Sequence, residues 1–271
     1  MDSRPIGVFD SGLGGLTAAG VLESILPGEN LIYFGDSRNA PYGTRSREEL
    51  LRLACANAEF LSGFDCKALL VACGTVSSNV MEELRGRVSV PVYGVLEAPC
   101  RRAAELTASG RVAVIATEAT IRSGAFAARL QTLNPALQVY SKACQSFVAL
   151  AEQGHFRAGD PLAEAAVAAE LAPVRDFAPD VLLLACTHFP LFEASIAAYL
   201  GPGTKLISVG AVAAEELKSE LDSRGMLADR ELGSRRWFTS GSTEQFSVQG
   251  AILLGHPVAA EKHCTDEVGK I

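Results

Sequence analysis

One strand-like motif occurs twice in this chain. The segment FDCKALLVAC at residues 64–73 is matched by FAPDVLLLAC at residues 177–186. Each is a short apolar run typical of a strand buried in a parallel sheet, and each ends in a cysteine. Ligands of open α/β sheets bind just outside the carboxyl ends of the strands, so the repeat predicts two thiols, Cys73 and Cys186, in two similar crevices. If the two halves face each other across one ligand, the thiols flank it from opposite sides.

Strand-like and helix-like patterns alternate along nearly the whole chain, which predicts parallel sheets with helices on their faces. Strands are expected at residues 6–10, 30–35, 68–72, 90–93, 111–116, 138–141, 181–185 and 205–209. Helices are expected up to about residue 26 and at 46–62, 75–87, 97–108, 121–133, 146–170 and 190–200, and one more helix–strand–helix unit closes the chain.

The fold class is therefore α/β, with two pseudo-symmetric domains, each a mainly parallel sheet flanked by helices. We expect residues 1–97 and 208–271 to form the first domain and residues 98–207 the second. The active site is expected in the cleft between them.

The charge and the hydrophobic pattern of the chain argue against two classes of partner, nucleic acids and membranes. The net charge of −7 argues against nucleic acid as a partner, because phosphate binding needs a concentrated basic surface. The pairs Arg101-Arg102 and Arg235-Arg236 are short and typical of solvated faces. No apolar stretch approaches the roughly 20 residues that span a bilayer, so no membrane partner is expected.

The N-terminus and the cysteines indicate the compartment. The chain enters a strand-like segment at residue 6, which leaves no room for a signal peptide and predicts a cytoplasmic protein. Its seven cysteines include no CxxC pair, so neither a zinc site nor another metal site is expected. Most of the seven are expected to be small buried hydrophobes, and the position after a strand separates Cys73 and Cys186 from Cys55, Cys66, Cys100 and Cys144.

The first turn follows a strand and precedes a helix. Its glycines, Gly12, Gly14 and Gly15, permit close backbone approach, but their spacing is neither the dinucleotide fingerprint nor a Walker loop. Two interpretations of Asp10 stay open. The carboxylate either binds an ammonium or orients a neighbouring base, or it caps the turn.

The two cysteine turns carry further polar groups. A thiol at a helix start has its thiolate stabilised by backbone N–H groups, so the pKa of Cys73 and of Cys186 is expected below the free value of about 8.5. Thr75 and Thr187 offer donors for a carboxylate. His188 either assists Cys186, donates to a bound carboxylate, or serves as a helix cap.

Four motifs together resemble the glutamate racemases of the aspartate/glutamate racemase superfamily. They are DSGLGGLT at 10–17, FGD at 34–36 with PYG at 41–43, ACGT at 72–75, and ACTHFPL at 185–191. Phe147 and Val148, with Glu152 and Gly154, also resemble a segment of the family. The resemblance spans most of the chain, to about residue 200.

The resemblance implies a site and an activity. The catalytic residues would be the two thiols Cys73 and Cys186, with Asp10, His188 and Glu152 as supporting acid–base groups. The substrate-binding residues would be Asp10, Ser11, Tyr42, Gly43, Gly74, Thr75, Thr187 and His188. The reaction would be a cofactor-independent interconversion of L- and D-glutamate that supplies D-glutamate for peptidoglycan, in an enzyme that forms a homodimer in some relatives.

Three positions depart from the family pattern. Gly74 stands where an asparagine usually contacts the amino acid, Gln145 where a proline is common, and Ser208 where the strand usually ends in aspartate. The altered pocket leaves other functions open. These are a racemase of aspartate, of another amino acid or of a hydantoin, a decarboxylase of the same superfamily, a redox sensor with a reversible disulfide between the thiols, and a non-catalytic binding protein.

Overall fold

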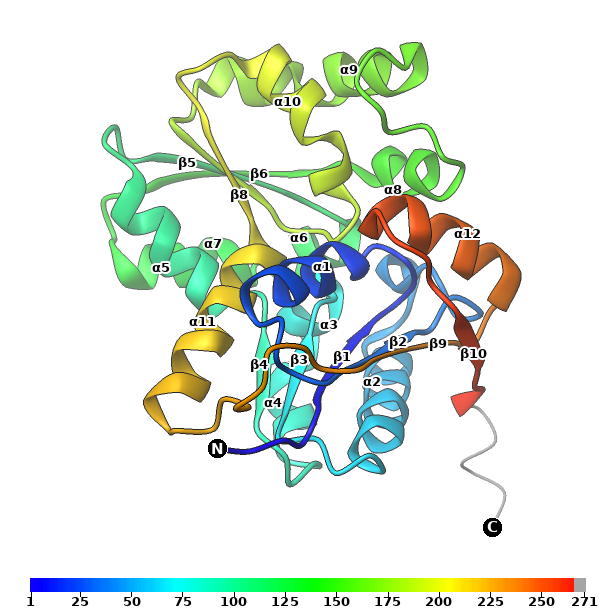
Figure 1. Ribbon diagram of the computed structural model, residues 1–271. Helices are drawn as coiled ribbons and strands as arrows, with labels where there is room; N and C mark the ends of the chain where they lie inside the picture. Colours follow the sequence, from blue (N-terminus) through cyan, green and yellow to red (C-terminus); the bar gives the residue numbers. More distant parts are fainter. Residues whose placement is uncertain (266–271) are drawn as a thin grey trace.

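The computed structural model describes residues 1–265, which form two parallel sheets flanked by helices (Figure 1). The first sheet has the order β10-β9-β2-β1-β3-β4 and the second the order β6-β5-β7-β8. Every strand pair in both sheets is parallel. The α/β class predicted from the alternating pattern is thus confirmed.

The elements follow one another in near-regular alternation. The strands are β1 (Ile6–Asp10), β2 (Leu31–Gly35), β3 (Ala68–Val71), β4 (Val92–Gly94), β5 (Arg111–Ala116), β6 (Gln138–Ala143), β7 (Val181–Leu184), β8 (Lys205–Ser208), β9 (Arg235–Thr239) and β10 (Ala260–Lys262). The α-helices are α1 (Leu16–Ile25), α2 (Arg47–Ser62), α3 (Gly74–Asn79), α4 (Met81–Arg85), α5 (Glu97–Leu106), α6 (Glu118–Ser123), α7 (Ala125–Leu133), α8 (Gln145–Glu152), α9 (Pro161–Phe177), α10 (Glu193–Leu200), α11 (Val209–Ser223) and α12 (Thr243–Leu254). Two short 3₁₀ turns are η1 (Tyr42–Thr44) and η2 (Phe189–Phe192).

The internal repeat is visible in the strand order. Four strands of the first sheet run β2-β1-β3-β4, and the second sheet repeats this order as β6-β5-β7-β8. The repeated motifs become β3 and β7, each of which pairs with the first strand of its own series. All residues of β3 and β7 are buried, as expected for apolar strands covered on both faces.

Two of the expected helices are interrupted. The segment expected as one helix at 75–87 is α3 and α4, separated at Val80, whose φ of −135° is not helical. The segment expected at 121–133 is α6 and α7, which meet at Gly124 with φ +67°. A left-handed glycine ends a helix without steric cost, so α7 starts in a new direction.

The end of the chain adds a strand that the sequence pattern does not predict. Residues 260–262 form β10, which pairs with β9 at the edge of the first sheet. His263 beyond it stacks on Phe60, with 3.7 Å between ring centroids. This part of the tail is packed on the sheet, and the rest of the tail lies outside the described residues.

One hydrophobic core runs through both sheets. It contains Val8 and Leu70 from the first sheet and Val114 and Leu183 from the second. Helix α11 contributes Leu217 and packs on α1, α5, β3 and β8, so it bridges the two halves, as Figure 1 shows. This shared core places the carboxyl ends of β1, β3 and β7 around one common space.

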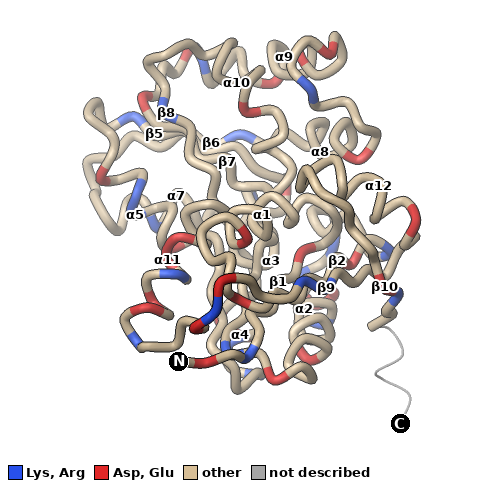
Figure 2. Tube along the Cα trace, in the orientation of Figure 1, with Lys and Arg blue, Asp and Glu red and all other residues tan. Residues whose placement is uncertain are grey.

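The basic pairs singled out in the sequence are engaged in ion pairs. Arg101 and Arg102 contact glutamates of α11, and Arg235 and Arg236 contact Glu23 and Glu261. Figure 2 shows blue and red segments interspersed over the molecule. Among the described residues, no helix is both long and apolar enough to cross a bilayer.

Candidate active site

A cavity of about 510 Å³ lies at the carboxyl ends of the strands. Ten of the residues predicted from the sequence line it: Ser11, Tyr42, Gly43, Cys73, Gly74, Thr75, Glu152, Cys186, Thr187 and His188. The remaining one, Asp10, is fully buried beneath it. The structure therefore brings residues from four separate motifs to one space.

The two thiols enter this cavity from equivalent strands. Cys73 begins the turn after β3, and Cys186 lies just beyond β7. Both are free and both are buried, with 4% and 6% of their surface exposed. Burial keeps bulk water away from the sulfur atoms, while the cavity gives a small molecule access to them.

The expectation of a lowered pKa is wrong for Cys73. Burial raises the pKa of this thiol to about 12, and the negative charge of Asp10 acts in the same direction. The backbone N–H groups of Val76 and Thr75 favour the thiolate, as predicted, but they are outweighed. The local sequence indicates the helix start correctly and does not reveal how completely the sulfur is desolvated.

His188 connects Cys186 to Glu152. The Nδ1 atom of His188 is 3.8 Å from Cys186 Sγ, and its Nε2 atom is 2.6 Å from Glu152 Oε1. Burial by itself lowers the pKa of His188, but the hydrogen bonds with Cys186 and Glu152 outweigh it and hold the pKa well above its usual range. His188 therefore favours its protonated form beside the second thiol.

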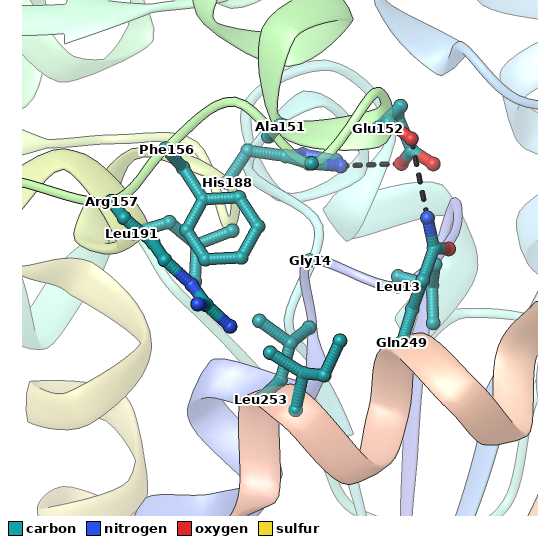
Figure 3. Close-up of a pocket in the computed structure, with 12 residues that line it drawn as sticks. Leu13, Gly14, Ala151, Glu152, Phe156, Arg157, His188, Leu191, Gln249 and Leu253 are labelled. Carbon is teal, nitrogen blue, oxygen red and sulfur yellow. Dashed lines mark hydrogen bonds and ion pairs between the residues drawn. The ribbon is translucent and has the colours of Figure 1, made fainter. Parts of the chain in front are cut away.

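Glu152 and His188 also line a second cavity, of about 220 Å³, shown in Figure 3. There Gln249 of α12 donates from Nε2 to the main-chain oxygen of Glu152 at 3.2 Å. This contact fixes the end of α8 that carries the Glu152 carboxylate.

Asp10 holds the first turn together. Its Oδ2 atom accepts hydrogen bonds from the backbone N–H of Gly15 at 2.8 Å and of Gly12 at 3.3 Å. The hydroxyl of Thr187 donates to the same carboxylate. Of the two interpretations of Asp10, the geometry favours turn capping, and the Thr187 contact adds a link to the second cysteine motif.

The glycine-rich turn packs directly against that motif. A Cβ atom on Gly14 would lie 2.5 Å from Thr187 Oγ1 and 2.8 Å from His188 Nδ1. Thr17 also donates to the main-chain oxygen of Thr187 at 3.2 Å. Glycine is needed at position 14 because this turn packs directly against the side chains of Thr187 and His188, which follow β7.

Three threonine hydroxyls form a chain of contacts at another wall of the cavity, which Thr75 and Thr117 line. Thr75 Oγ1 lies 3.0 Å from Thr117 Oγ1, and Thr117 lies 3.0 Å from Thr120 Oγ1. Thr117 lines the cavity and caps α6 by accepting from the backbone N–H of Thr120. The sequence interpretation missed Thr117 and Thr120. The internal repeat contains the signal for Thr117, because this residue follows β5 as Ser11 follows β1.

The hydroxyl of Tyr42 is already engaged. It donates to Asp36 Oδ2 at 2.5 Å and accepts from Asn57 Nδ2 at 3.0 Å. Tyr42 therefore fixes the position of the neighbouring Gly43, and its phenol is not a free donor for a ligand.

The three departures from the family pattern have different surroundings. A Cβ atom on Gly74 would lie 2.3 Å from the carbonyl oxygen of Ala185. Gln145, at the start of α8, lines the cavity. Ser208 is the N-cap of α11, where its hydroxyl accepts from Ala211 N–H at 3.5 Å, and it is not among the residues that line the cavity.

Metal-binding chemistry finds no support among the described residues. No three His, Cys, Asp or Glu side chains within residues 1–265 come together closely enough to hold an ion. The arrangement consists of two thiols, one histidine–carboxylate pair and several hydroxyl and backbone donors. Such a set can move protons and hold a carboxylate.

Comparison with known proteins agrees with this geometry. Residues 17–217 match the family described as Asp/Glu/Hydantoin racemase. A glutamate racemase from Geobacter metallireducens is 40% identical over 256 residues, which cover 94% of each chain. The crystal structure of a glutamate racemase isoform from Bacillus anthracis has a TM-score of 0.92 at 35% identity, covering 97% of this chain and 98% of that one.

One similar solved structure contains a bound amino acid. The crystal structure of glutamate racemase from Francisella tularensis in complex with D-glutamate has a TM-score of 0.90 at 35% identity, covering 98% of this chain and 100% of that one. Sequence and fold thus agree over almost the full length, and this chain belongs to the Asp/Glu/hydantoin racemase family, where its close relatives are glutamate racemases.

Proposed function

We propose that the protein interconverts L- and D-glutamate by a cofactor-independent transfer of the α-proton between two thiols. The observation that carries this proposal is the pair Cys73 and Cys186, which follow equivalent strands of the two sheets and line the same cavity. Two proton-transfer groups that enter one cavity from separate sheets suit a reaction that removes hydrogen from one face of a carbon and returns it to the other.

The reaction balances without an external oxidant or reductant. For the D-isomer, the Cys73 thiolate takes the α-hydrogen as a proton and leaves the electron pair on the α-carbon and its carboxylate. The Cys186 thiol then gives its proton to the opposite face, which forms the L-isomer and leaves a thiolate at Cys186. The reverse direction exchanges the two roles.

Burial of Cys73 makes its thiolate a stronger base toward the α-proton of an amino acid. The high pKa of Cys73 lowers the fraction of thiolate, but it also makes the thiolate that forms a stronger base toward a very weak carbon acid. The ammonium group of a bound amino acid adds a positive charge next to that thiolate and favours its formation. Holding thiolate and α-hydrogen in contact is worth several kcal/mol more.

The supporting groups have distinct roles in the proposal. His188, kept protonated by its hydrogen bonds with Cys186 and Glu152, returns a proton to Cys186 and holds its sulfur in place. The hydroxyls of Ser11 and Thr75 and the backbone N–H of Thr187, whose own hydroxyl donates to Asp10, bind the carboxylate on which carbanion charge develops, where fixed donors lower the barrier most. Asp10 positions Thr187 and the first turn.

We also propose how the chain divides into domains, where the enzyme acts and how it assembles. We place the domain boundaries so that residues 1–97 and 208–271 form one domain and residues 98–207 the other, because helix α5 packs on the second sheet and α11 bridges both. The enzyme would act in the cytoplasm, supply D-glutamate for peptidoglycan, and form a homodimer. Sedimentation velocity tests the dimer.

The deciding experiment follows D-glutamate in deuterated buffer by circular dichroism and by proton NMR of the α-position. Loss of optical activity together with α-deuteration is the expected result. Activity on another amino acid only would keep the mechanism and change the substrate. No exchange with any amino acid of a broad panel would contradict the proposal and favour a binding or redox function of the cavity.

A further inference from the structure

We propose that Gln145 binds a carboxylate of the amino-acid substrate, and that it supplies the carboxamide which this chain lacks at position 74. This inference rests on the proposed function and names one residue that determines how the substrate is held. Gly74 and Gln145 are both departures from the family pattern, and both line the same cavity. One departure removes a carboxamide from the cavity and the other adds one.

Position 74 has no room for the missing side chain. A Cβ atom there would lie 2.3 Å from the carbonyl oxygen of Ala185 and 3.9 Å from the Cα atom of Cys186. These neighbours are main-chain atoms of the segment that follows β7, so they cannot yield by rotating a side chain. An asparagine at this position would require the ends of β3 and β7 to move apart.

The orientation of the Gln145 carboxamide follows from its neighbours. The backbone N–H of Glu118 donates to Gln145 Oε1 at 3.4 Å, and the same oxygen lies close to Gly43, 3.3 Å from where a Cβ would stand. Because an N–H group must face the carboxamide oxygen, the NH₂ group points away from Glu118. Within residues 1–265, Gln145 Nε2 has no hydrogen-bond partner, so its two N–H groups are free for a ligand in the cavity.

The placement suits a carboxylate. Gln145 lies beside Thr117, since both are within reach of Gly43, and Thr117 in turn contacts Thr75. The carboxamide N–H groups therefore extend a wall of hydroxyl donors. Gln145 is the first residue of α8, the helix that ends at Glu152, so its backbone is fixed by the element that carries the partner of His188.

The test compares Gln145→Met with the matched control Gln153→Met. Methionine keeps the length of the side chain and removes the N–H donors. Gln153 lies at the other end of α8, is exposed, and is not among the residues that line the cavity. For Gln145→Met we expect KM for D-glutamate to rise about 10-fold to 100-fold, the usual loss for one hydrogen bond to a charged group, while kcat changes less than about 3-fold. The control is expected to match the parent protein in both constants.

A second variant separates substrate contact from packing. Gln145→Glu has nearly the same shape and places a negative charge beside the bound carboxylate, so its KM is expected to exceed that of Gln145→Met. Equal KM values for Gln145→Met, Gln145→Glu and the parent protein would overturn the inference. Loss of kcat in both variants with unchanged KM would overturn it too, because Gln145 would then act on the reaction rather than on binding.

A binding measurement keeps this inference separable from the proposed function. Isothermal titration calorimetry gives the Kd for D-glutamate without turnover being required. If the parent protein binds D-glutamate without racemising it, the proposed function fails, and a weaker Kd in Gln145→Met still supports the role of Gln145. If the parent protein racemises glutamate and the variant binds it equally well, the inference alone fails. A parent protein that neither binds nor converts glutamate contradicts both.

Discussion

The main chain at Gly74 lies directly against the carbonyl group of Ala185, so that a Cβ at position 74 would stand 2.3 Å from the Ala185 oxygen. Gly74 follows Cys73 and Ala185 precedes Cys186, which makes this contact the point where the two thiol-bearing segments touch. The close approach of these two segments is therefore made at a residue without a side chain.

Gly74→Ala is expected to lower both stability and turnover. The added methyl group forces the ends of β3 and β7 apart, and overpacking of this kind costs about 1–3 kcal/mol of unfolding free energy. Urea denaturation and kcat for D-glutamate measure the two effects. Gly203→Ala is the control, because no atom lies within 4 Å of its added Cβ. Identical stability of the two variants would mean that the strand ends separate freely.

The sequence predicts the thiols and their strands well because both signals are local. An apolar run that ends in cysteine needs no knowledge of distant residues, and the repeat relates β3 to β7. The pKa of Cys73 depends on burial and on Asp10, which is 63 positions away, and Gly74 and Ala185 are 111 positions apart, so no local pattern contains either feature. Thr117 lies between these cases. Its place after β5 follows from the repeat, but threonine is common at helix starts and does not by itself indicate a site as a cysteine at a strand end does.

The difference between local signals and contacts made in the folded protein also explains why two expected helices are divided and why strand β10 is not predicted. Gly124 divides an expected helix because its backbone takes a left-handed conformation, which the sequence permits but does not require. Strand β10 has only three residues and depends on pairing with β9. The formation of such a short edge strand depends on hydrogen bonding to the neighbouring strand rather than on the strand's own hydrophobic pattern.

Replacing the thiols one at a time is expected to separate the two half-reactions. In Cys186→Ser, racemisation of D-glutamate falls by about 10²–10⁴-fold, since a weak acid replaces the second proton donor. Exchange of the α-hydrogen of D-glutamate with solvent persists, because Cys73 still removes it. Cys73→Ser shows the converse with L-glutamate. Polarimetry and α-deuteration by NMR measure each reaction, and Cys55→Ser, on α2 outside the cavity, controls for loss of a thiol. Undiminished racemisation in either active-site variant would rule out the two-thiol mechanism.

Alkylation of Cys73 in the ligand-free enzyme is expected to rise steadily with pH. With a pKa of about 12 instead of 9.0, the thiolate fraction at neutral pH is lower by about 1000-fold. The rate of carbamidomethylation at Cys73, measured by peptide mass spectrometry, should therefore increase about tenfold per pH unit and continue to rise above pH 9. Circular dichroism identifies the pH at which unfolding begins. A plateau between pH 8 and 9 in folded protein would show that the thiol is not desolvated.

Glu152→Gln is expected to lower the pKa of His188. Burial disfavours the imidazolium, and without the carboxylate the hydrogen bond at His188 Nε2 no longer compensates. The folded-state pKa of His188 is raised above the unfolded value of 6.5, so the stabilisation is fully present below pH 6.5 and is lost as pH rises through the folded-state pKa. The decrease in Tm caused by Glu152→Gln should thus be larger at pH 6 than at pH 9, and a carbon-13 titration of the His188 ring should show the lower pKa directly. Glu105→Gln, on an exposed face of α5, should shift neither quantity. An unchanged His188 titration in Glu152→Gln would mean that Cys186 alone holds the proton on the imidazole.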